Sequence, residues 1–323
     1  MRSRPQLVRS LSLSFFVALV FASGAFAEAP IPIDYDYGDS ALSLSALGAE
    51  NPVEFQGRLT RPATMDGVHP IVVLLHGRHS TCEGPFGETL RWPCAGSEQP
   101  TPSHLGYDYL AEALANKGIV VISISANGIN AMDNYVEDGG AMARAELIQE
   151  HLKLLERANT GSVEPFGDAL VGHLDLTRVG TMGHSRGGEG VVQHYLYNKQ
   201  LGEPFGIKAV LPLAPVSFGS LTPAGVPLAV TLGYCDGDVY TLDGVHYFDR
   251  IRPNASDSAP KHLVVLYGGN HNFFNTVWSP TTYGPGAMDD WEIMETYVGK
   301  DAHCSASSAQ NGRLTEEEQK DTL

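Results

Sequence analysis

The sequence predicts an α/β fold in which a mostly parallel central sheet is covered by helices on both faces. Short apolar runs recur along the chain, as buried parallel strands require. Segments with helical periodicity separate these runs, and such alternation is typical of a covered parallel sheet. The 323 residues are 43% apolar and 18% charged, which indicates a globular protein with a sizeable core.

Seven apolar runs are predicted as strands because each is short and bounded by polar or turn-forming residues. They cover residues 53–59, 71–75, 119–125, 179–182, 209–213, 228–232 and 263–267. Helices are predicted around residues 107–114, where apolar side chains recur at i, i+3, i+4 and i+7, and over residues 141–158 and 187–198.

A single domain is predicted over residues 51–305, and the sequence has no internal repeat and no second core. Residues 28–50 are acidic, contain Ser and Pro, and have weak periodicity, which predicts a mobile leader. Residues 306–323 form an acidic tail in which Thr315 and Glu318 match a capping box. The tail is expected to be either disordered or the start of a helix that continues in a longer chain, and both alternatives predict weak order.

The first 27 residues have the pattern of a secretory signal peptide. Three arginines precede an apolar run over residues 11–22, and Ala25-Phe26-Ala27 supplies small residues before a cleavage point at Glu28. The chain is therefore expected to be extracellular or periplasmic, with no stable membrane anchor after cleavage. Cleavage would change the net charge from −16 to −19, so nucleic acid is not an expected partner.

Four cysteines in an exported chain favour disulfide bonds. Of the three possible pairings we predict Cys82–Cys94, which would close a short local loop, with Cys235–Cys304, which would anchor the chain end beside Asp236. No Cys-x-x-Cys pair is present, so a zinc site is not expected. No cofactor is predicted.

The most informative motif is Gly-His-Ser-Arg-Gly at residues 183–187, between a predicted strand and a predicted helix. It matches G-x-S-x-G, the sequence of a sharp turn that lifts the serine above the sheet edge. This turn requires glycine two residues before and two residues after the serine. Ser185 is the candidate nucleophile. The adjacent His184 is expected to point away from the serine and to pack as a structural residue.

Residues 70–275 resemble the α/β-hydrolase superfamily. Residues 183–188 are identical to the lipase-like motif of chlorophyllases, and the order of elements is similar to cutinase-like polyester hydrolases and platelet-activating-factor acetylhydrolases. The resemblance implies a serine esterase of the α/β-hydrolase fold. The six identical residues do not specify a substrate.

The superfamily order of nucleophile, acid and histidine implies the other two members of a triad. Asp236 follows the strand at 228–232 in a G-x-x-D-x-x-V pattern, and Asp238 is the alternative acid. His271 follows the last predicted strand in a glycine-rich loop and is the expected base. The backbone N–H groups of Arg78 and Arg186 are the expected oxyanion hole, whereas their side chains are equally suited to ion pairs with nearby acids.

Only fourteen residues, 214–227, separate two predicted strands where many lipases insert a cap domain. We therefore predict an open site with no large cap. The long loop at 78–104 carries Phe86 and Trp92, and these two side chains and Trp278 are candidate walls of the acyl pocket; ordinary loop packing is the alternative. Residues 127–135 are a further candidate wall.

The predicted function is hydrolysis of a carboxylic ester through an acyl-enzyme. The alternatives are a peptidase or amidase of the same fold, which commonly needs an accessory domain, and a non-catalytic binding protein. A small soluble ester, a lipid and a polyester all remain open as substrates.

Overall fold

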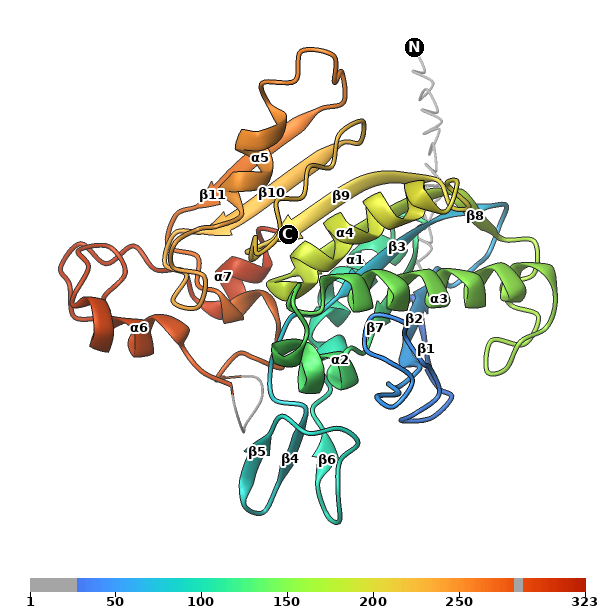
Figure 1. The fold of residues 1–323 in the computed structure, drawn as a ribbon, viewed down its shortest axis with the longest axis horizontal. Coiled ribbons are helices and arrows are strands. Elements are labelled where there is room, and N and C mark those ends of the chain that lie inside the picture. The colour runs from blue at the N-terminus through green and yellow to red at the C-terminus, as the bar shows by residue number, and fades with distance from the viewer. Residues whose placement is uncertain (1–27, 282–286) are drawn as a thin grey trace, which may run out of the picture.

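The computed structural model describes residues 28–281 and 287–323. An eight-stranded sheet with the order β1-β2-β7-β3-β8-β9-β10-β11 runs through the molecule (Figure 1). Its strands are β1 (Ile31–Asp36), β2 (Gln56–Arg61), β3 (His69–Leu75), β7 (Val120–Ile124), β8 (Leu174–His184), β9 (Ile207–Leu213), β10 (Leu228–Gly233) and β11 (Lys261–Leu266). The predicted signal peptide lies outside the described residues.

Strand direction places the ends of the parallel strands at one edge of the sheet. Strand β2 pairs antiparallel with both β1 and β7, whereas all neighbours from β7 to β11 are parallel. Each of the seven predicted strands overlaps one of these strands, and the prediction of a mostly parallel sheet is confirmed. In such sheets, binding sites form beyond the carboxyl ends of the strands.

Helices cover both faces of the sheet, as predicted. The α-helices are α1 (Asp108–Ala115), α2 (Asn127–Met132), α3 (Ala141–Thr160), α4 (Arg186–Gln200), α5 (Val245–Ile251), α6 (Asp290–Val298) and α7 (Glu316–Lys320), with short 3-10 turns η1 (Ser103–Tyr107), η2 (Asp133–Tyr135) and η3 (Asn272–Phe274). Helices α3, α4 and α5 contribute to the larger core on one face, whereas α1 and η3 contribute to a smaller core on the other.

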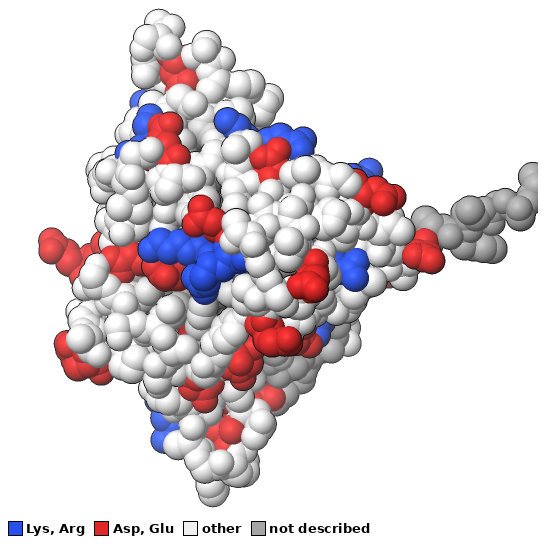
Figure 2. All heavy atoms as spheres, turned by 90° about the vertical axis from the view of Figure 1, so that its right-hand side faces the viewer, with Lys and Arg blue, Asp and Glu red and all other residues white. Residues whose placement is uncertain are grey.

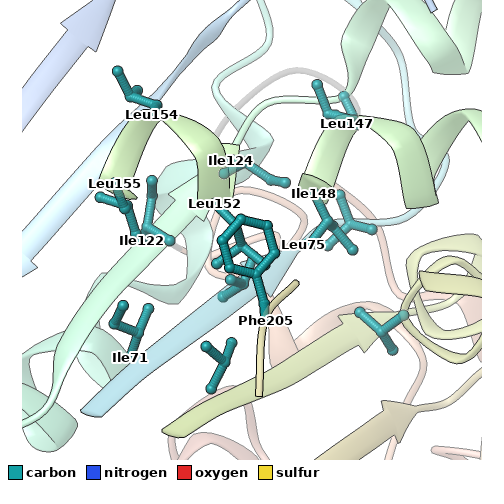
Figure 3. Packing of buried hydrophobic residues seen from close by; sticks show 14 of the residues in the cluster. Ile71, Leu75, Ile122, Ile124, Leu147, Ile148, Leu152, Leu154, Leu155 and Phe205 are labelled. Atoms are coloured by element: carbon teal, nitrogen blue, oxygen red, sulfur yellow. The ribbon is translucent and has the colours of Figure 1, made fainter. Parts of the chain in front are cut away.

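The larger core is built where α3 crosses the central strands (Figure 3). Apolar residues of α3 recur every three or four positions and turn one face of the helix toward β3 and β7. Each buried leucine or isoleucine stabilises the fold by about 1.5–3 kcal/mol relative to an exposed one. The residues in this contact include Leu147, Ile148, Leu152 and Leu155 of α3 and Ile71, Leu75, Ile122 and Ile124 of the strands.

The segment after β3 forms a small sheet of its own, which projects from the body of the molecule (Figure 1). Its strands, in the order β5-β4-β6, are β4 (Cys82–Gly84), β5 (Gly87–Thr89) and β6 (Gln99–Pro100). The disulfide Cys82–Cys94 ties this segment, and Cys235–Cys304 joins the loop after β10 to the C-terminal region. Both predicted disulfides are confirmed.

The prediction of a mobile leader over residues 28–50 is wrong. Six residue pairs join β1 to β2 along the edge of the sheet. The side chains of Tyr35, Leu44 and Leu47 are buried in the larger core, and the Tyr35 hydroxyl bonds to Nδ1 of His151 at 2.8 Å. A few well-placed large side chains are thus sufficient to dock a segment whose average composition is polar.

The prediction of a weakly ordered tail is also wrong. The capping box at Thr315 and Glu318 is present, but α7 packs against the domain. The fully buried Gln319 side chain accepts from the Asn270 backbone N–H (2.7 Å) and donates to the Asn270 carbonyl oxygen (2.6 Å). The Leu314 N–H donates to the Gly268 carbonyl oxygen, and Leu323 packs on the smaller core. Specific hydrogen bonds replace the broad apolar face that the tail lacks.

Residues 214–227, between β9 and β10, contain no helix, as expected. In the part of the chain that the structure describes, no helix has both the length and the apolar character needed to span a bilayer. On the face shown in Figure 2, acidic side chains lie among the basic ones. The basic side chains therefore form no extended basic patch on this face.

We predict that Gln319→Ala lowers the melting temperature by about 3 °C or more, because it removes two buried hydrogen bonds worth about 1 kcal/mol each. Glu317→Ala is the matched control, since Glu317 is exposed in the same helix. Deleting residues 306–323 should lower the melting temperature further, as measured by calorimetry. An unchanged melting temperature in the deletion variant would show that the tail is not docked.

Candidate active site

Ser185 lies at a sharp turn between β8 and α4. Its backbone has φ 58° and ψ −123°, a conformation that non-glycine residues rarely adopt and that costs about 1–3 kcal/mol. Two hydrogen bonds hold the turn: the Ser185 N–H donates to the Leu213 carbonyl oxygen, and the Gly188 N–H donates to the Ser185 carbonyl oxygen, both at 2.9 Å. The predicted strand–turn–helix context of Ser185 is therefore present.

The flanking glycines leave room for this turn. A Cβ atom at Gly183 would lie 2.0 Å from the Gly187 carbonyl oxygen. A Cβ atom at Gly187 would lie 2.6 Å from the carbonyl oxygens of Leu75 and His76. Backbone atoms cannot move away cheaply, so only glycine fits at these two positions, as the G-x-S-x-G pattern predicts.

The loop after β3 lies directly against Ser185. A Cβ atom at Gly77 would lie 2.5 Å from Ser185 Cβ and 3.2 Å from Ser185 Oγ. His76 fixes this loop: its Nε2 accepts from the Ala126 N–H at 2.8 Å, and its Nδ1 lies 2.8 Å from the Gly77 carbonyl oxygen. Burial lowers the pKa of His76 to about 3, so the ring is neutral and Nδ1 carries the proton.

The orientation of the peptide between Gly77 and Arg78 follows from these contacts. The Gly77 carbonyl oxygen accepts from His76 and, at 3.0 Å, from the Asn130 side chain. In a trans peptide the N–H points opposite to the C=O, so the Arg78 N–H points away from both donors. The Arg186 N–H is in the first turn of α4, where backbone donors have no partner within the helix.

The side chains of Arg78 and Arg186 meet at one buried carboxylate. Asp133 is fully buried and lies 3.0 Å from Arg78 Nε and 3.0 Å from Arg186 Nη1. The buried Arg144 approaches the other oxygen of Asp133 at 2.9 Å. Asp133 thus ties the two residues predicted to form the oxyanion hole, and the ion-pair alternative for their side chains is realised.

Asp236 and His271 form a buried pair beyond the carboxyl ends of β10 and β11. Asp236 Oδ2 lies 2.7 Å from His271 Nδ1, and both residues are about 1% exposed. The other Asp236 oxygen accepts from the N–H groups of Asp238 (3.0 Å) and Val239 (2.6 Å). Asp236, rather than Asp238, therefore occupies the position that orients the imidazole.

Asp238 lies on the opposite side of the ring. Its carboxylate is 62% exposed and is 3.4 Å from His271 Nε2. It also lines the cavity that contains Ser185, so it stands between that cavity and the buried Nε2. No hydrogen bond joins Ser185 Oγ to His271 Nε2, a contact that often forms only with substrate in serine enzymes.

The charges around His271 favour its protonated form. Burial alone would lower its pKa, but the negative charges of Asp236, Asp238 and Asp290 raise it to about 10. His184 also faces this ring, with centroids 4.9 Å apart. Burial keeps the pKa of His184 well below its usual value, and its Nδ1 bonds to the Tyr107 hydroxyl at 3.0 Å. His184 is thus a packed neutral residue, as predicted.

The cavity beside Ser185 has a volume of about 300 Å³. Charged side chains surround it, and Val216, Phe218 and Val239 supply its apolar surface. Phe218 is 56% exposed and lies under the Arg186 guanidinium, 5.3 Å from carbon to ring centroid. Glu189 of α4 holds this wall by accepting from the N–H groups of Phe218 (3.2 Å) and Gly219 (2.7 Å).

The three aromatic wall candidates do not line this cavity, and that prediction is wrong. Phe86 is fully exposed in the turn between β4 and β5, and Trp92 donates to the Asp39 carbonyl oxygen at 2.8 Å. Trp278 is buried behind His184 and stacks on His79. Residues 127–135 do not line the cavity either, although Asn130, Asp133 and Asn134 bond to Gly77, Arg78 and Arg186 beside it. Nothing in the sequence distinguished Val216, Phe218 or Asp133 from other loop residues.

No model of a known protein family matches the chain, and no curated protein matches it either. Among the described residues, no group of three or more histidine, cysteine or acidic side chains is arranged to hold a metal ion.

We predict that Asp236→Asn lowers the turnover of an ester substrate about a thousandfold or more, because an amide cannot hold His271 in the required tautomer. Asp238→Asn should lower it less than about tenfold, since Asp238 does not contact Nδ1. Steady-state kinetics of both variants, with melting temperatures as a check on folding, measure the difference. The reverse order would identify Asp238 as the acid.

Activity should rise with pH, because His271 must lose its proton before it can act as a base and its pKa is raised to about 10. Asp238→Asn removes one of the charges that raise this pKa, so the acidic limb of kcat/KM should move to lower pH. Asp236, Asp290 and His184 are unchanged in that variant. A pH profile that is the same in both proteins would contradict the role of Asp238.

Proposed function

We propose that this protein is an exported serine hydrolase of the α/β-hydrolase superfamily that cleaves carboxylic esters. The observation that carries the proposal is the buried Asp236–His271 pair, whose Nε2 lies 3.4 Å from Asp238, a residue that lines the same cavity as Ser185 on its strained turn. These three side chains come from the ends of β8, β10 and β11, in the chain order nucleophile, acid and base.

The reaction follows from these positions. Ser185 Oγ attacks the ester carbonyl while His271 Nε2 takes the hydroxyl proton, and Asp236 stabilises the imidazolium through Nδ1–H. The N–H groups of Arg78 and Arg186 bind the oxyanion of the tetrahedral intermediate. The alcohol leaves with the proton from His271, and an acyl-enzyme remains on Ser185. Water then attacks the acyl group while His271 accepts its proton. The bond to Ser185 Oγ breaks, Oγ takes this proton back from His271, and the acid is released.

The cavity favours a small and polar substrate. Its volume of about 300 Å³ is at the low end for ligand sites, and Arg78, Arg186, Asp238 and Asp243 contribute to its lining. A long acyl chain would find little apolar surface there. We therefore propose short-chain esters as the preferred substrates, with no cofactor. The two disulfides support an oxidising compartment outside the cytoplasm.

We expect Ser185→Ala to abolish hydrolysis of p-nitrophenyl acetate, a loss of about a thousandfold or more, while the melting temperature does not fall. A fluorophosphonate should label the wild-type protein and not the variant. Activity should decline from acetate to palmitate esters.

The same assays separate the alternatives. Faster cleavage of peptide p-nitroanilides than of esters would indicate a peptidase or amidase. A wild-type protein that neither turns over esters nor reacts with the fluorophosphonate would indicate a non-catalytic binding protein and contradict the proposal.

A further inference from the structure

A second buried carboxylate lies behind the Asp236–His271 pair. Asp290, the first residue of α6, is 6% exposed and accepts three backbone hydrogen bonds. The donors are the N–H groups of Gly237 (2.5 Å), His271 (3.2 Å) and Asn272 (3.0 Å). Three N–H donors to one carboxylate are a strong set, because hydrogen bonds to an ionised acceptor are about twice as strong as neutral ones.

These three donors belong to two different loops. Gly237 follows Asp236 in the acid loop, defined here as residues 233–239. His271 and Asn272 lie in the base loop, residues 268–274. Asp290 therefore binds the backbone next to the acid and the backbone of the base itself. In contrast, the hydrogen bond between Asp236 and His271 joins the two loops only through the side chains of the proposed acid and base.

The fit between Asp290 and the acid loop is tight. A Cβ atom at Gly237 would lie 2.3 Å from the Asp290 carbonyl oxygen, so the acid loop rests on the backbone of α6. The adjacent Asp289 caps α6 by accepting from the Trp291 N–H (3.1 Å), and it also accepts from the Asn270 side chain at 3.0 Å. The start of α6 is thus held in place independently of Asp290, and the Asp290 carboxylate is aimed between the loops.

We propose that Asp290 is a positioning residue that sets the distance and orientation of Asp236 relative to His271. This inference rests on the proposed function, because it describes how that site is held. Asp290 touches neither Ser185 nor the cavity that contains it among the described contacts. Apart from the direct effect of its charge on the pKa of His271, its effect on catalysis therefore has to pass through the two loops.

The ionisation state of Asp290 matters for the test. Burial and the nearby charge of Asp236 raise its pKa to about 7, whereas His271 and the donated N–H groups act to lower it. Assays at about pH 9 keep the carboxyl ionised, so that both oxygens accept. Under these conditions Asp290→Asn removes the charge and replaces one acceptor with an N–H₂ donor. Asp290→Glu keeps the charge but changes the reach by one methylene.

The matched control is Asp257→Asn at the opposite end of the same two strands. Asp257 also accepts two backbone N–H bonds, from Gly225 (2.9 Å) and Ala259 (3.0 Å), and it pairs with Lys261 at 3.0 Å. It joins the segments that precede β10 and β11, as Asp290 joins the loops that follow them. If the only effect is the loss of a carboxylate that joins two segments, Asp257→Asn and Asp290→Asn should both lower the melting temperature.

The experiment combines kinetics with a titration of His271 that needs no activity. We expect Asp290→Asn to lower kcat on p-nitrophenyl acetate, taken for the unprotonated form of His271 from the pH profile, by about tenfold to a hundredfold, with KM changed less than about twofold, because small misplacements of a base cost this much. The His271 imidazole, followed by NMR and identified by its absence in His271→Gln, should titrate at lower pH. Asp290→Glu should lose kcat as well but titrate closer to wild type.

Asp257→Asn should leave kcat and the His271 titration unchanged. The inference is overturned if the Asp290 variants lose only melting temperature, as a merely structural residue would. If Asp290→Asn does not fold, Asp290→Glu decides by the same two readouts. If the wild-type protein has no esterase activity, the proposed function fails, and the NMR titration of Asp290→Glu decides, because this variant keeps the charge. A His271 that titrates as in the wild type overturns the positioning role, and a shifted one supports it.

Discussion

The close approach of three backbone segments at Ser185 is the constraint on which the rest of the site depends. The end of β3, the turn after β8 and the end of β9 approach one another there so closely that residues 77 and 187 have no room for a Cβ atom. The Ser185 N–H is bound to β9, Gly187 rests on the carbonyl oxygens of residues 75 and 76, and Gly77 lies against the serine side chain. Packed parallel strands position all three segments, and their burial offsets the strain of the turn.

The two halves of the candidate site are held by different means. The nucleophile half is supported by strand ends, by neutral His76 and by Asp133 with its three arginines. The acid–base half consists of loops, and these are held from behind by α6, by the tail through Gln319 and by the Cys235–Cys304 disulfide. One half is therefore fixed by the sheet and the other by the C-terminal region.

The sequence predicted the parts of this arrangement that depend on local pattern. Apolar runs located the strands, glycines located the turn at Ser185, and chain order selected Asp236 and His271. The disulfides followed from spacing and count. Each of these signals is local because the physical requirement behind it is local, such as the absence of a Cβ atom at Gly187.

Features that depend on distant contacts were predicted wrongly or missed. The leader docks through Tyr35 and the tail through Gln319, single residues whose partners lie more than forty positions away. Average composition cannot show such a contact. The aromatic residues Phe86 and Trp278 were suited to a pocket wall. However, Phe86 lies in the small sheet and is exposed to solvent, and Trp278 is buried behind His184. Asp133 and Asp290 were missed because nothing distinguishes a bridging carboxylate from a surface one in sequence.

The docking of the last residues has a consequence for the time at which the proposed activity develops. The base loop contacts Gln319, 49 residues after Asn270, and the acid loop is bonded to Cys304, 69 residues after Cys235. A nascent chain that has already formed the turn at Ser185 still lacks both anchors of its acid–base half. The geometry of the proposed acid–base pair therefore depends on completion of this C-terminal region and, for the acid loop, on formation of the Cys235–Cys304 disulfide.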